Sequence, residues 1–430
     1  MRYDILTIFP KFFESPFSFG ILKKAQEKGL IQINVHDIRD FAPDKHNTVD
    51  DSPYGGGSGM VFKPGPLGDA IEFAKADGAR SLVILTTPQG ERFSDKIARE
   101  LTEYEQLIII CGRYEGVDER IREIYVDREI SIGDYVLSGG EYAASVIIDA
   151  VSRLIPGVLG NEASPYDDSF RGGLLEYPQY TRPETYKRKA VPEILLSGNH
   201  KEIEKWRRGE GVKRTFFRRP DLLDRASLTV EELKLIRRLR RENPPSFRVY
   251  VALVHYPVYN KDLRIVTTAF TNLDVHDISR ACRTYGVRVF FLVHPVQEQR
   301  VLVERVLRHW TEGPGVLYNP TRNEALALVR IKSSLSEALE EIEKVEDSKP
   351  KVVVTDARPG ENLTGYSELK ERIITGEEPY LILFGTGWGI AKEVMERADY
   401  ALKPIEGNTD YNHLSVRSAA AVVLDRLLSN

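Results

Sequence analysis

Glycine-rich segments are the parts of this chain best suited to hold a ligand. Residues 130–141 read I-S-I-G-D-Y-V-L-S-G-G-E. Because glycine has no side chain, another group can approach the main chain closely and use its N–H and C=O groups. From Tyr142 to Ile155 apolar residues recur at helical spacing, so this segment is expected to open onto an amphipathic helix. A tight turn between two core elements would also explain the glycines, and the pattern alone leaves both interpretations open.

Three further glycine-bearing segments come earlier in the chain: D-D-S-P-Y-G-G-G-S-G-M (50–60), T-T-P-Q-G (86–90) and C-G-R-Y-E-G (111–116). The last of them directly follows an apolar, strand-like run. In a parallel α/β sheet, ligands gather at the loops beyond the carboxyl ends of the strands. These loops together with 130–141 therefore predict one shared ligand site rather than four independent turns.

Several common site types are disfavoured. There is no G-x-x-x-x-G-K-[ST], which argues against hydrolysis of nucleoside triphosphates. The dinucleotide fingerprint fails because Phe62 and Ile390 stand where its third glycine would be required. The eight histidines are scattered and there are only two cysteines, so no metal site is predicted.

Alternating strand-like and helix-like segments must position these loops. Before residue 160, strands are expected at Tyr3–Phe9, Ile31–His36, Ser81–Thr86 and Leu107–Cys111. Helices are expected at Phe12–Glu27, Pro66–Asp77, Ser94–Glu105 and Tyr142–Ile155. Such alternation predicts an α/β domain with a largely parallel sheet. It resumes after the Pro-Pro linker near residue 245 and predicts a second α/β domain.

Four regions are therefore expected: an α/β domain at 1–160, a flexible linker at 161–173, a basic helical domain at 174–242 and a second α/β domain at 246–430. The linker lacks periodicity but carries Asp167 and Asp168, where a mobile catalytic loop would keep a carboxylate. A chain of 430 residues is long enough for about two or three domains.

Composition predicts a globular protein outside the membrane. Hydrophobic residues make up 42% of the chain and charged residues 29%, and no apolar run approaches the roughly 18 residues of a membrane span. Asp4 interrupts any signal-peptide core. Cys111 and Cys282 are too few for a disulfide framework and fit a reducing cytosol, so a cytoplasmic location is expected.

The charge is concentrated in one block. Residues 182–241 hold 18 Lys/Arg against 9 Asp/Glu, a net charge of +9. Since the whole chain carries −4, the remaining residues carry −13. Here basic residues interleave with Trp206, Phe216 and Phe217, which suits a phosphate backbone with unstacked bases. The RNA-binding candidates are Arg207, Arg208, Arg218 and Arg219. A solvated, Arg-rich helical domain with the two phenylalanines in a small core is the alternative.

Eight motifs also occur in a recognisable order, at residues 53–60, 87–90, 111–120, 131–141, 156–164, 168–170, 180–183 and 191–200. Through them the first 243 residues or so closely resemble the bacterial tRNA (guanine-N1)-methyltransferases, the TrmD family of the SPOUT superfamily. The resemblance implies a parallel α/β domain with a deep trefoil knot and a homodimer whose active site lies between the subunits. It also implies methyl transfer from S-adenosylmethionine to N1 of the guanosine 3′ to the tRNA anticodon, position 37, when another guanosine precedes it.

The resemblance implies roles for individual residues. The cofactor contacts would be Pro88, Gly112, Glu115, Ile132, Gly133, Tyr135, Leu137, Gly139 and Gly140. Asp168 would be the general base that removes the N1 proton, and Arg153 would stabilise the charge that develops on guanine O6. Arg153 also fits an ordinary cation at a helix C-terminus. The family uses Mg²⁺ as well, but no residue cluster for it can be picked out.

The second α/β domain also resembles SPOUT proteins. F-G-T-G-W-G (384–389), L-K-P-I-E-G (402–407) and N-H-L-S-V-R-S-A-A-A-V (412–422) look like their late cofactor-binding segments. The candidate cofactor residues are Gly385, Gly387, Gly389, Ile405 and Leu414. This domain is expected to be a second RNA methyltransferase that uses S-adenosylmethionine, or else a non-catalytic RNA-binding or dimerisation module. A third interpretation takes the whole chain as a small-molecule methyltransferase, and the basic block at 182–241 argues against it.

Overall fold

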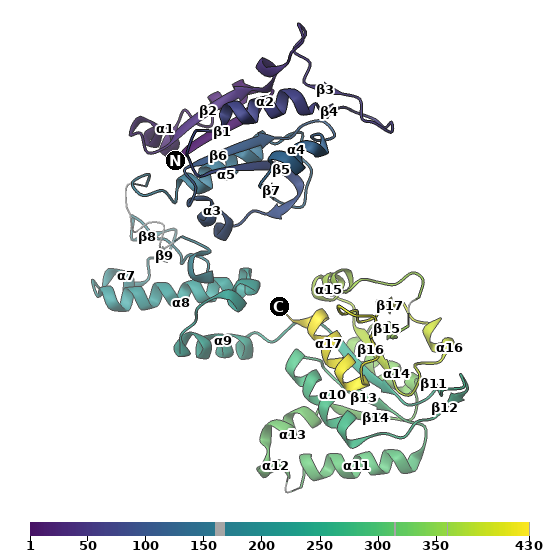
Figure 1. Cartoon of the computed structure of the whole chain (residues 1–430). Coiled ribbons are helices and arrows are strands. Elements are labelled where there is room, and N and C mark those ends of the chain that lie inside the picture. The colour runs from purple at the N-terminus through teal and green to yellow at the C-terminus, as the bar shows by residue number, and fades with distance from the viewer. Residues whose placement is uncertain (160–167, 314, 359, 430) are drawn as a thin grey trace. The chain divides into compact units, whose positions relative to one another are not determined.

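The computed structural model describes residues 1–159, 168–313, 315–358 and 360–429. The chain forms two compact units, Met1–Ile236 and Arg237–Asn430 (Figure 1). The division falls within helix α9 (Val230–Glu242), a few residues before the predicted linker. Asp167 and much of the predicted 161–173 linker lie outside the described residues.

The first unit is built on a parallel sheet. Its strands are β1 (Arg2–Thr7), β2 (Gln32–Asp37), β5 (Ser81–Arg92), β6 (Gln106–Cys111) and β7 (Arg128–Ser131), in the order β2-β1-β6-β5-β7. Every neighbouring pair runs parallel. All of β6 is buried, which explains its unbroken apolar run, since a central parallel strand is covered on both faces.

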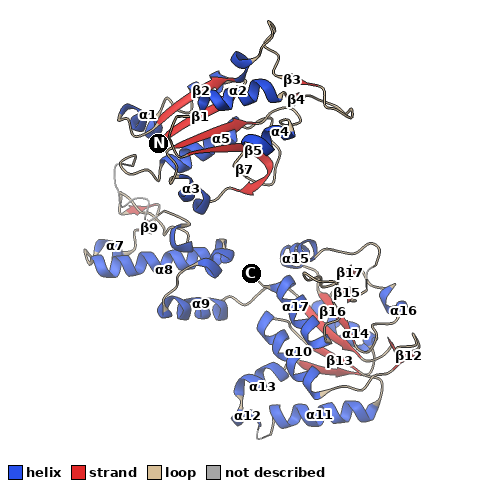
Figure 2. Ribbon diagram, viewed as in Figure 1, coloured by secondary structure: helices blue, strands red, loops and turns tan. Residues whose placement is uncertain are grey.

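Helices cover both faces of this sheet (Figure 2). One face packs against α1 (Gly20–Glu27), α3 (Asp95–Leu101) and α5 (Glu141–Ser152), and the other against α2 (Pro64–Ala74) and α4 (Glu119–Tyr125). A short hairpin, β3 (Asp50–Asp51) with β4 (Val61–Phe62), carries the first glycine-rich loop. Helix α5 buries Ala144, Ile147, Ile148 and Val151, which confirms the predicted amphipathic helix.

The predicted elements needed several corrections. The helix expected over Phe12–Glu27 is a 3-10 turn at Pro10–Glu14 followed by α1, because Gly20 begins α1 with a left-handed φ of +65°. Strand β7 and helix α4 were missed, since each is short. Strand β5 continues through T-T-P-Q-G to Arg92 with a shift of register, so this predicted loop lies within a strand.

The basic region of the first unit is helical. It contains α7 (Glu193–Leu196), α8 (His200–Arg218) and the start of α9, with a small hairpin of β8 (Thr185–Tyr186) and β9 (Lys189–Ala190). Phe216 is partly buried against the core of this region, whereas Phe217 is 58% exposed. The core interpretation therefore holds for one of the two phenylalanines.

The second unit has another parallel sheet. Its strands are β10 (Val249–Val254), β13 (Phe290–Val293), β14 (Val329–Lys332), β15 (Lys351–Thr355), β16 (Tyr380–Gly385) and β17 (Tyr400–Leu402), in the order β14-β13-β10-β16-β15-β17. A hairpin joins β11 (Val258–Tyr259) to β12 (Ile265–Val266). The helices are α10 (Asn272–Tyr285), α11 (Gln297–Thr311), α12 (Gly315–Tyr318), α13 (Pro320–Leu326), α14 (Leu335–Glu346), α15 (Tyr366–Thr375), α16 (Lys392–Met395) and α17 (Val416–Leu428).

The two sheets share one strand order. The first reads β2-β1-β6-β5-β7 and the second β13-β10-β16-β15-β17, with β14 added at its edge. In β5, just before the shift of register, the Thr86 hydroxyl donates a hydrogen bond to the Ile110 carbonyl at 2.9 Å. Thr355, at the end of β15, donates to the Leu383 carbonyl at the same distance. The matching bonds align β5 with β15 and β6 with β16, residue by residue.

A second repeated contact aligns the last strands. The Val83 N–H donates to the Asp127 carboxylate at 2.8 Å, just before β7. In the second unit the Val352 N–H donates to the Asp399 carboxylate at 2.8 Å, just before β17. Each half of the chain therefore places the loops after its matching strands at the same edge of its sheet.

Candidate active sites

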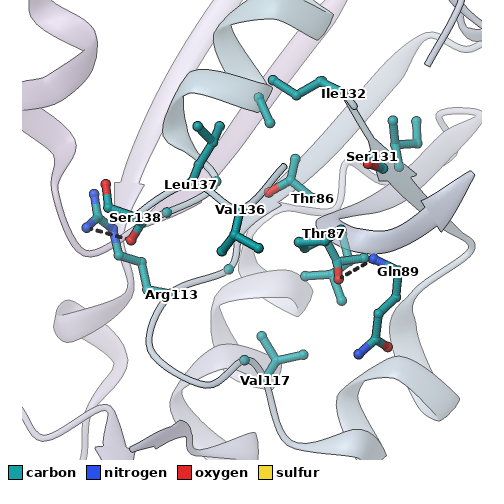
Figure 3. A pocket seen from close by; sticks show the side chains of 18 of the residues that line it. Thr86, Thr87, Gln89, Arg113, Val117, Ser131, Ile132, Val136, Leu137 and Ser138 are labelled. Carbon is teal, nitrogen blue, oxygen red and sulfur yellow. Dashed lines mark hydrogen bonds between the residues drawn. The ribbon is translucent and has the colours of Figure 1, made fainter. Parts of the chain in front are cut away.

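A cavity of about 310 Å³ in the first unit is lined by residues 85–89 of β5 and by the loops that follow β6 and β7 (Figure 3). In that view Arg113 and Ser138 lie on one side of the cavity and Thr87 and Gln89 on the other. All the predicted cofactor residues line this cavity: Pro88, Gly112, Glu115, Ile132, Gly133, Tyr135, Leu137, Gly139 and Gly140. The fold thus gathers three of the glycine-bearing segments at one place.

Of the glycines that line this cavity, Gly140 has the closest main-chain neighbours. Its N–H donates to the Gly112 carbonyl at 2.9 Å. A Cβ atom at Gly140 would lie 2.1 Å from the Thr86 hydroxyl oxygen and 2.8 Å from Cys111 Cα. Its φ of −77° is open to any residue. Glycine is needed here because of the close approach, and not because of a special backbone conformation.

A largely buried ion pair holds this loop in position. Arg113 Nη2 lies 2.9 Å from Glu141 Oε2, and the Glu141 side chain is only 1% exposed. The Thr7 hydroxyl donates to the same carboxylate at 2.8 Å, and Arg113 also donates to the Ser138 carbonyl at 3.1 Å. A buried carboxylate needs such partners. The sequence analysis did not single out either charged residue, although both stand within the motifs it quoted.

The predicted catalytic pair lies elsewhere. Arg153 Nη2 donates to Asp168 Oδ2 at 2.9 Å, and the two side chains are 39% and 43% exposed. Both residues line a cavity of about 280 Å³ together with Phe93 and Asp149. That cavity shares no lining residue with the first one. Arg153 caps the C-terminus of α5, where a cation is favourable. It also contacts Asp168, the candidate general base.

The four predicted RNA-binding arginines differ in their surroundings. The Arg207 guanidinium lies over the Tyr177 ring at 4.9 Å. Arg208 donates to the Glu232 carboxylate at 2.7 Å, and Arg219 pairs with Asp221, also at 2.7 Å. Among the residues that the structure describes, Arg218 has no hydrogen-bond or ion-pair partner. Among the described residues, Arg207 and Arg218 are therefore the two of the four whose charge is not paired with a carboxylate, and Arg218 contacts no ring either.

The Arg208 pair also supports the helical region itself. Burial alone would raise the pKa of Glu232, but the ion pair with Arg208 and the N–H of Thr229 lower it. Thr229 and Glu232 form a reciprocal cap at the start of α9, since the Glu232 N–H donates to the Thr229 hydroxyl. The sequence left Ser227 and Thr229 open as the residue that caps this helix, and these hydrogen bonds identify Thr229.

A cavity of about 690 Å³ lies at the matching edge of the second sheet. Its lining includes all five predicted residues of this unit: Gly385, Gly387, Gly389, Ile405 and Leu414. Asp356 and Arg358, which follow β15, also line it and form an ion pair at 2.6 Å. This cavity combines loops after β15, β16 and β17, as the first cavity combines the middle of β5 with the loops after β6 and β7.

Across the described ranges, no group of three or more His, Cys, Asp or Glu side chains could hold a metal ion. In the same part of the chain, no helix is both long and apolar enough to span a bilayer.

Comparison with known proteins identifies both halves. Residues 1–225 match the family model of the tRNA (guanine-1)-methyltransferase TrmD, and residues 248–429 match that of a SAM-dependent RNA methyltransferase. Proteins named tRNA (guanine-N(1)-)-methyltransferase from Oleidesulfovibrio alaskensis and Nitratidesulfovibrio vulgaris are each 45% identical over 430 residues, the full length of both chains compared. A protein of the same name from Geotalea uraniireducens is 57% identical over 241 residues, 56% of this chain and 98% of its own. The chain therefore belongs to the TrmD family of tRNA (guanine-1)-methyltransferases, with an RNA methyltransferase domain as its second half.

Proposed function

We propose that the first unit binds S-adenosylmethionine in the 310 Å³ cavity and methylates N1 of guanosine 37 in tRNA. One observation carries this proposal: segments separated by up to about fifty residues assemble on a single cavity at the strand ends. The close approach at Gly140 leaves main-chain groups free of side-chain cover, which suits recognition of a flat heterocycle. The cofactor, when bound, supplies an electrophilic methyl group.

Asp168 and Arg153 supply the remaining chemistry. Guanine N1 is a poor nucleophile that must lose its proton, and a positioned carboxylate can accept it. The negative charge then spreads to O6, which is bonded to the carbon next to N1, where a guanidinium would stabilise it. In the structure the two side chains lie 2.9 Å apart, so both can reach one edge of a guanine. Because their ion pair is well exposed, it contributes about 0–1 kcal/mol and is readily exchanged for contacts with the base.

The separation of the two cavities favours a homodimer. Asp168 does not line the cavity that would hold the cofactor in its own chain. A second copy that brings its Asp168 to this cavity would complete the site, in line with the family's shared active site and knotted fold. The described residues offer no metal cage, so no step is assigned to Mg²⁺. We place the enzyme in the cytoplasm, where its tRNA substrate is found.

The substitution Asp168→Asn tests the base assignment. It should reduce formation of N1-methylguanosine by about 100-fold or more, the usual contribution of a general base, and leave cofactor affinity unchanged. Asp149→Asn is the matched control, because Asp149 lines the same cavity and is exposed. Activity of Asp168→Asn close to that of the control would refute the assignment.

Hybrid dimers test whether the site is shared. Chains with Asp168→Asn and chains with Gly140→Ala are co-expressed with different tags, and the mixed dimer is purified. If Asp168 serves the cavity of its partner, one of the two sites in the hybrid is intact and activity returns to about half. If both functions reside in one chain, the hybrid stays inactive.

For the second unit we propose S-adenosylmethionine binding in the 690 Å³ cavity and methylation of an RNA. The matching hydrogen bonds of Thr86 and Thr355 support this, because they place the same loops around both cavities. A non-catalytic RNA-binding or dimerisation module remains the alternative. Calorimetric titration of the full chain with S-adenosylhomocysteine should give two sites per chain, and Gly140→Ala should remove only one of them. A single site in the native chain would favour the module.

A further inference from the structure

The glycine-rich loops after β6 and β16 have the same backbone conformation. Tyr114 and Gly387 both adopt a left-handed φ, +59° and +63°. Two residues later, Gly116 and Gly389 have φ of +127° and +102°. Together with the aligned strands, this repeated pattern matches the two loops residue by residue.

The match pairs residues of different chemistry. Glu115 of the first unit, a predicted cofactor contact, corresponds to Trp388 of the second. Each side chain lines the cavity of its own unit. An acidic side chain at one cavity is thus replaced by the largest aromatic side chain at the other.

The helices that follow the last strands also match. Each buries an alanine followed by three apolar residues at the same spacing: Ala144, Ile147, Ile148 and Val151 in α5, and Ala420, Val423, Leu424 and Leu427 in α17. This spacing pairs Arg153 with Ser429. At the position that matches Arg153, the arginine proposed to stabilise guanine O6, the second unit therefore has a serine.

Trp388 is presented on a fixed backbone. Its N–H donates to the Tyr259 carbonyl at 2.9 Å, and the Tyr259 N–H donates to the Gly389 carbonyl at 2.9 Å. The side chain is nevertheless 63% exposed, and its ring stacks on no other ring among the residues the structure describes. Exposing so large an apolar surface on a rigid loop is unfavourable unless a ligand covers it.

We propose that Trp388 stacks on an unpaired base of the RNA that the second unit methylates, a proposal that rests on the function given above for this unit. Base–aromatic stacking needs an open ring face and tolerates any base. Lys403, which is exposed on the same cavity, offers a charge for the adjoining phosphate. The high exposure favours an incoming base over the cofactor's adenine, which a cavity normally encloses.

The test uses the full chain with Trp388→Ala, Trp388→Phe and, as control, Tyr318→Ala, which removes an exposed aromatic side chain that does not line the cavity. Total RNA is methylated with labelled cofactor, and the modified nucleosides are separated. For the nucleoside made by the second unit, Trp388→Ala should lower kcat/KM by about 5- to 150-fold, as expected for loss of one stack, while Trp388→Phe stays within about threefold. N1-methylguanosine from the first unit is the internal control and should not change.

Binding measurements separate the two possible sources of a base. Quenching of Trp388 fluorescence, taken as the difference between the native chain and Trp388→Phe, is followed with S-adenosylhomocysteine alone and then with a random single-stranded RNA pool. Quenching by the RNA supports the proposal even if the second unit produces no modified nucleoside. The missing nucleoside would count against catalysis by the second unit, and not against stacking on Trp388. Quenching by S-adenosylhomocysteine with loss of its affinity in Trp388→Ala, or no quenching by RNA, would overturn it.

Discussion

Gly140→Ala adds a single methyl group at the closest main-chain contact of the first cavity. The new Cβ would lie 2.1 Å from Thr86 Oγ1, 2.8 Å from Cys111 Cα and 2.9 Å from the Gly112 nitrogen. Thr86 could rotate away, but it would then lose its buried hydrogen bond to the Ile110 carbonyl. The other two atoms belong to the main chain and cannot yield without shifting a strand end.

The size of the effect follows from these contacts. Overpacking typically costs about 1–3 kcal/mol, and loss of a buried hydrogen bond costs about 1 kcal/mol or more. We therefore expect Gly140→Ala to lower the free energy of unfolding by about 2–4 kcal/mol and to weaken cofactor binding by at least about tenfold. The φ of −77° adds no conformational penalty, so the loss is steric.

Calorimetry and chemical unfolding measure these effects, with Gly209→Ala as the matched control. A Cβ at Gly209, within α8, would meet no atom within 4 Å, and alanine should stabilise that helix by about 0.5–1 kcal/mol. The second cavity should keep its affinity in both variants. Native stability and native affinity in Gly140→Ala would refute the argument from close approach.

Two further predictions concern the basic region and the second unit. Arg218→Ala should weaken tRNA binding and reduce its salt slope by about 1, whereas Arg208→Ala should mainly destabilise the helical region by breaking the pair with Glu232; equal salt slopes in filter binding would contradict this difference. Burial and the neighbouring His294 lower the pKa of His255 to about 4 from 6.5, so the unfolded chain takes up a proton first and stability falls as the pH drops from 6.5 to 4. His255→Phe should remove this loss, which is worth about 3 kcal/mol. The free energies of unfolding of the variant and the native chain are measured in urea at several pH values. A difference between the two that stays constant with pH would contradict the prediction.

Much of the fold could be read from the sequence because its signals are local. The run L-I-I-I from Leu107 to Ile110 marks a strand buried on both faces, and the spacing from Tyr142 to Ile155 marks α5. Short elements such as β7 and α4 were missed, because a few residues carry little periodicity. The turn residues of T-T-P-Q-G predict a loop, because the segment itself shows only a weak strand pattern. It is part of β5 because the strand pairs with β7 on both sides of this segment.

By itself the sequence determined the family and the α/β alternation, because motif order and periodicity are properties of the chain alone. It also predicted one site shared by four glycine-bearing segments, of which three line the first cavity and the segment at 50–60 does not. Only the tertiary structure decided which charges remain available and which groups touch. Arg208 and Arg218 look alike in sequence, yet Glu232, 24 residues away from Arg208, neutralises only one of them. The stretch 130–141 likewise shows that glycine stands at 140. The nearness of Thr86 and Cys111, brought there by strand pairing, is the physical reason that no larger residue fits.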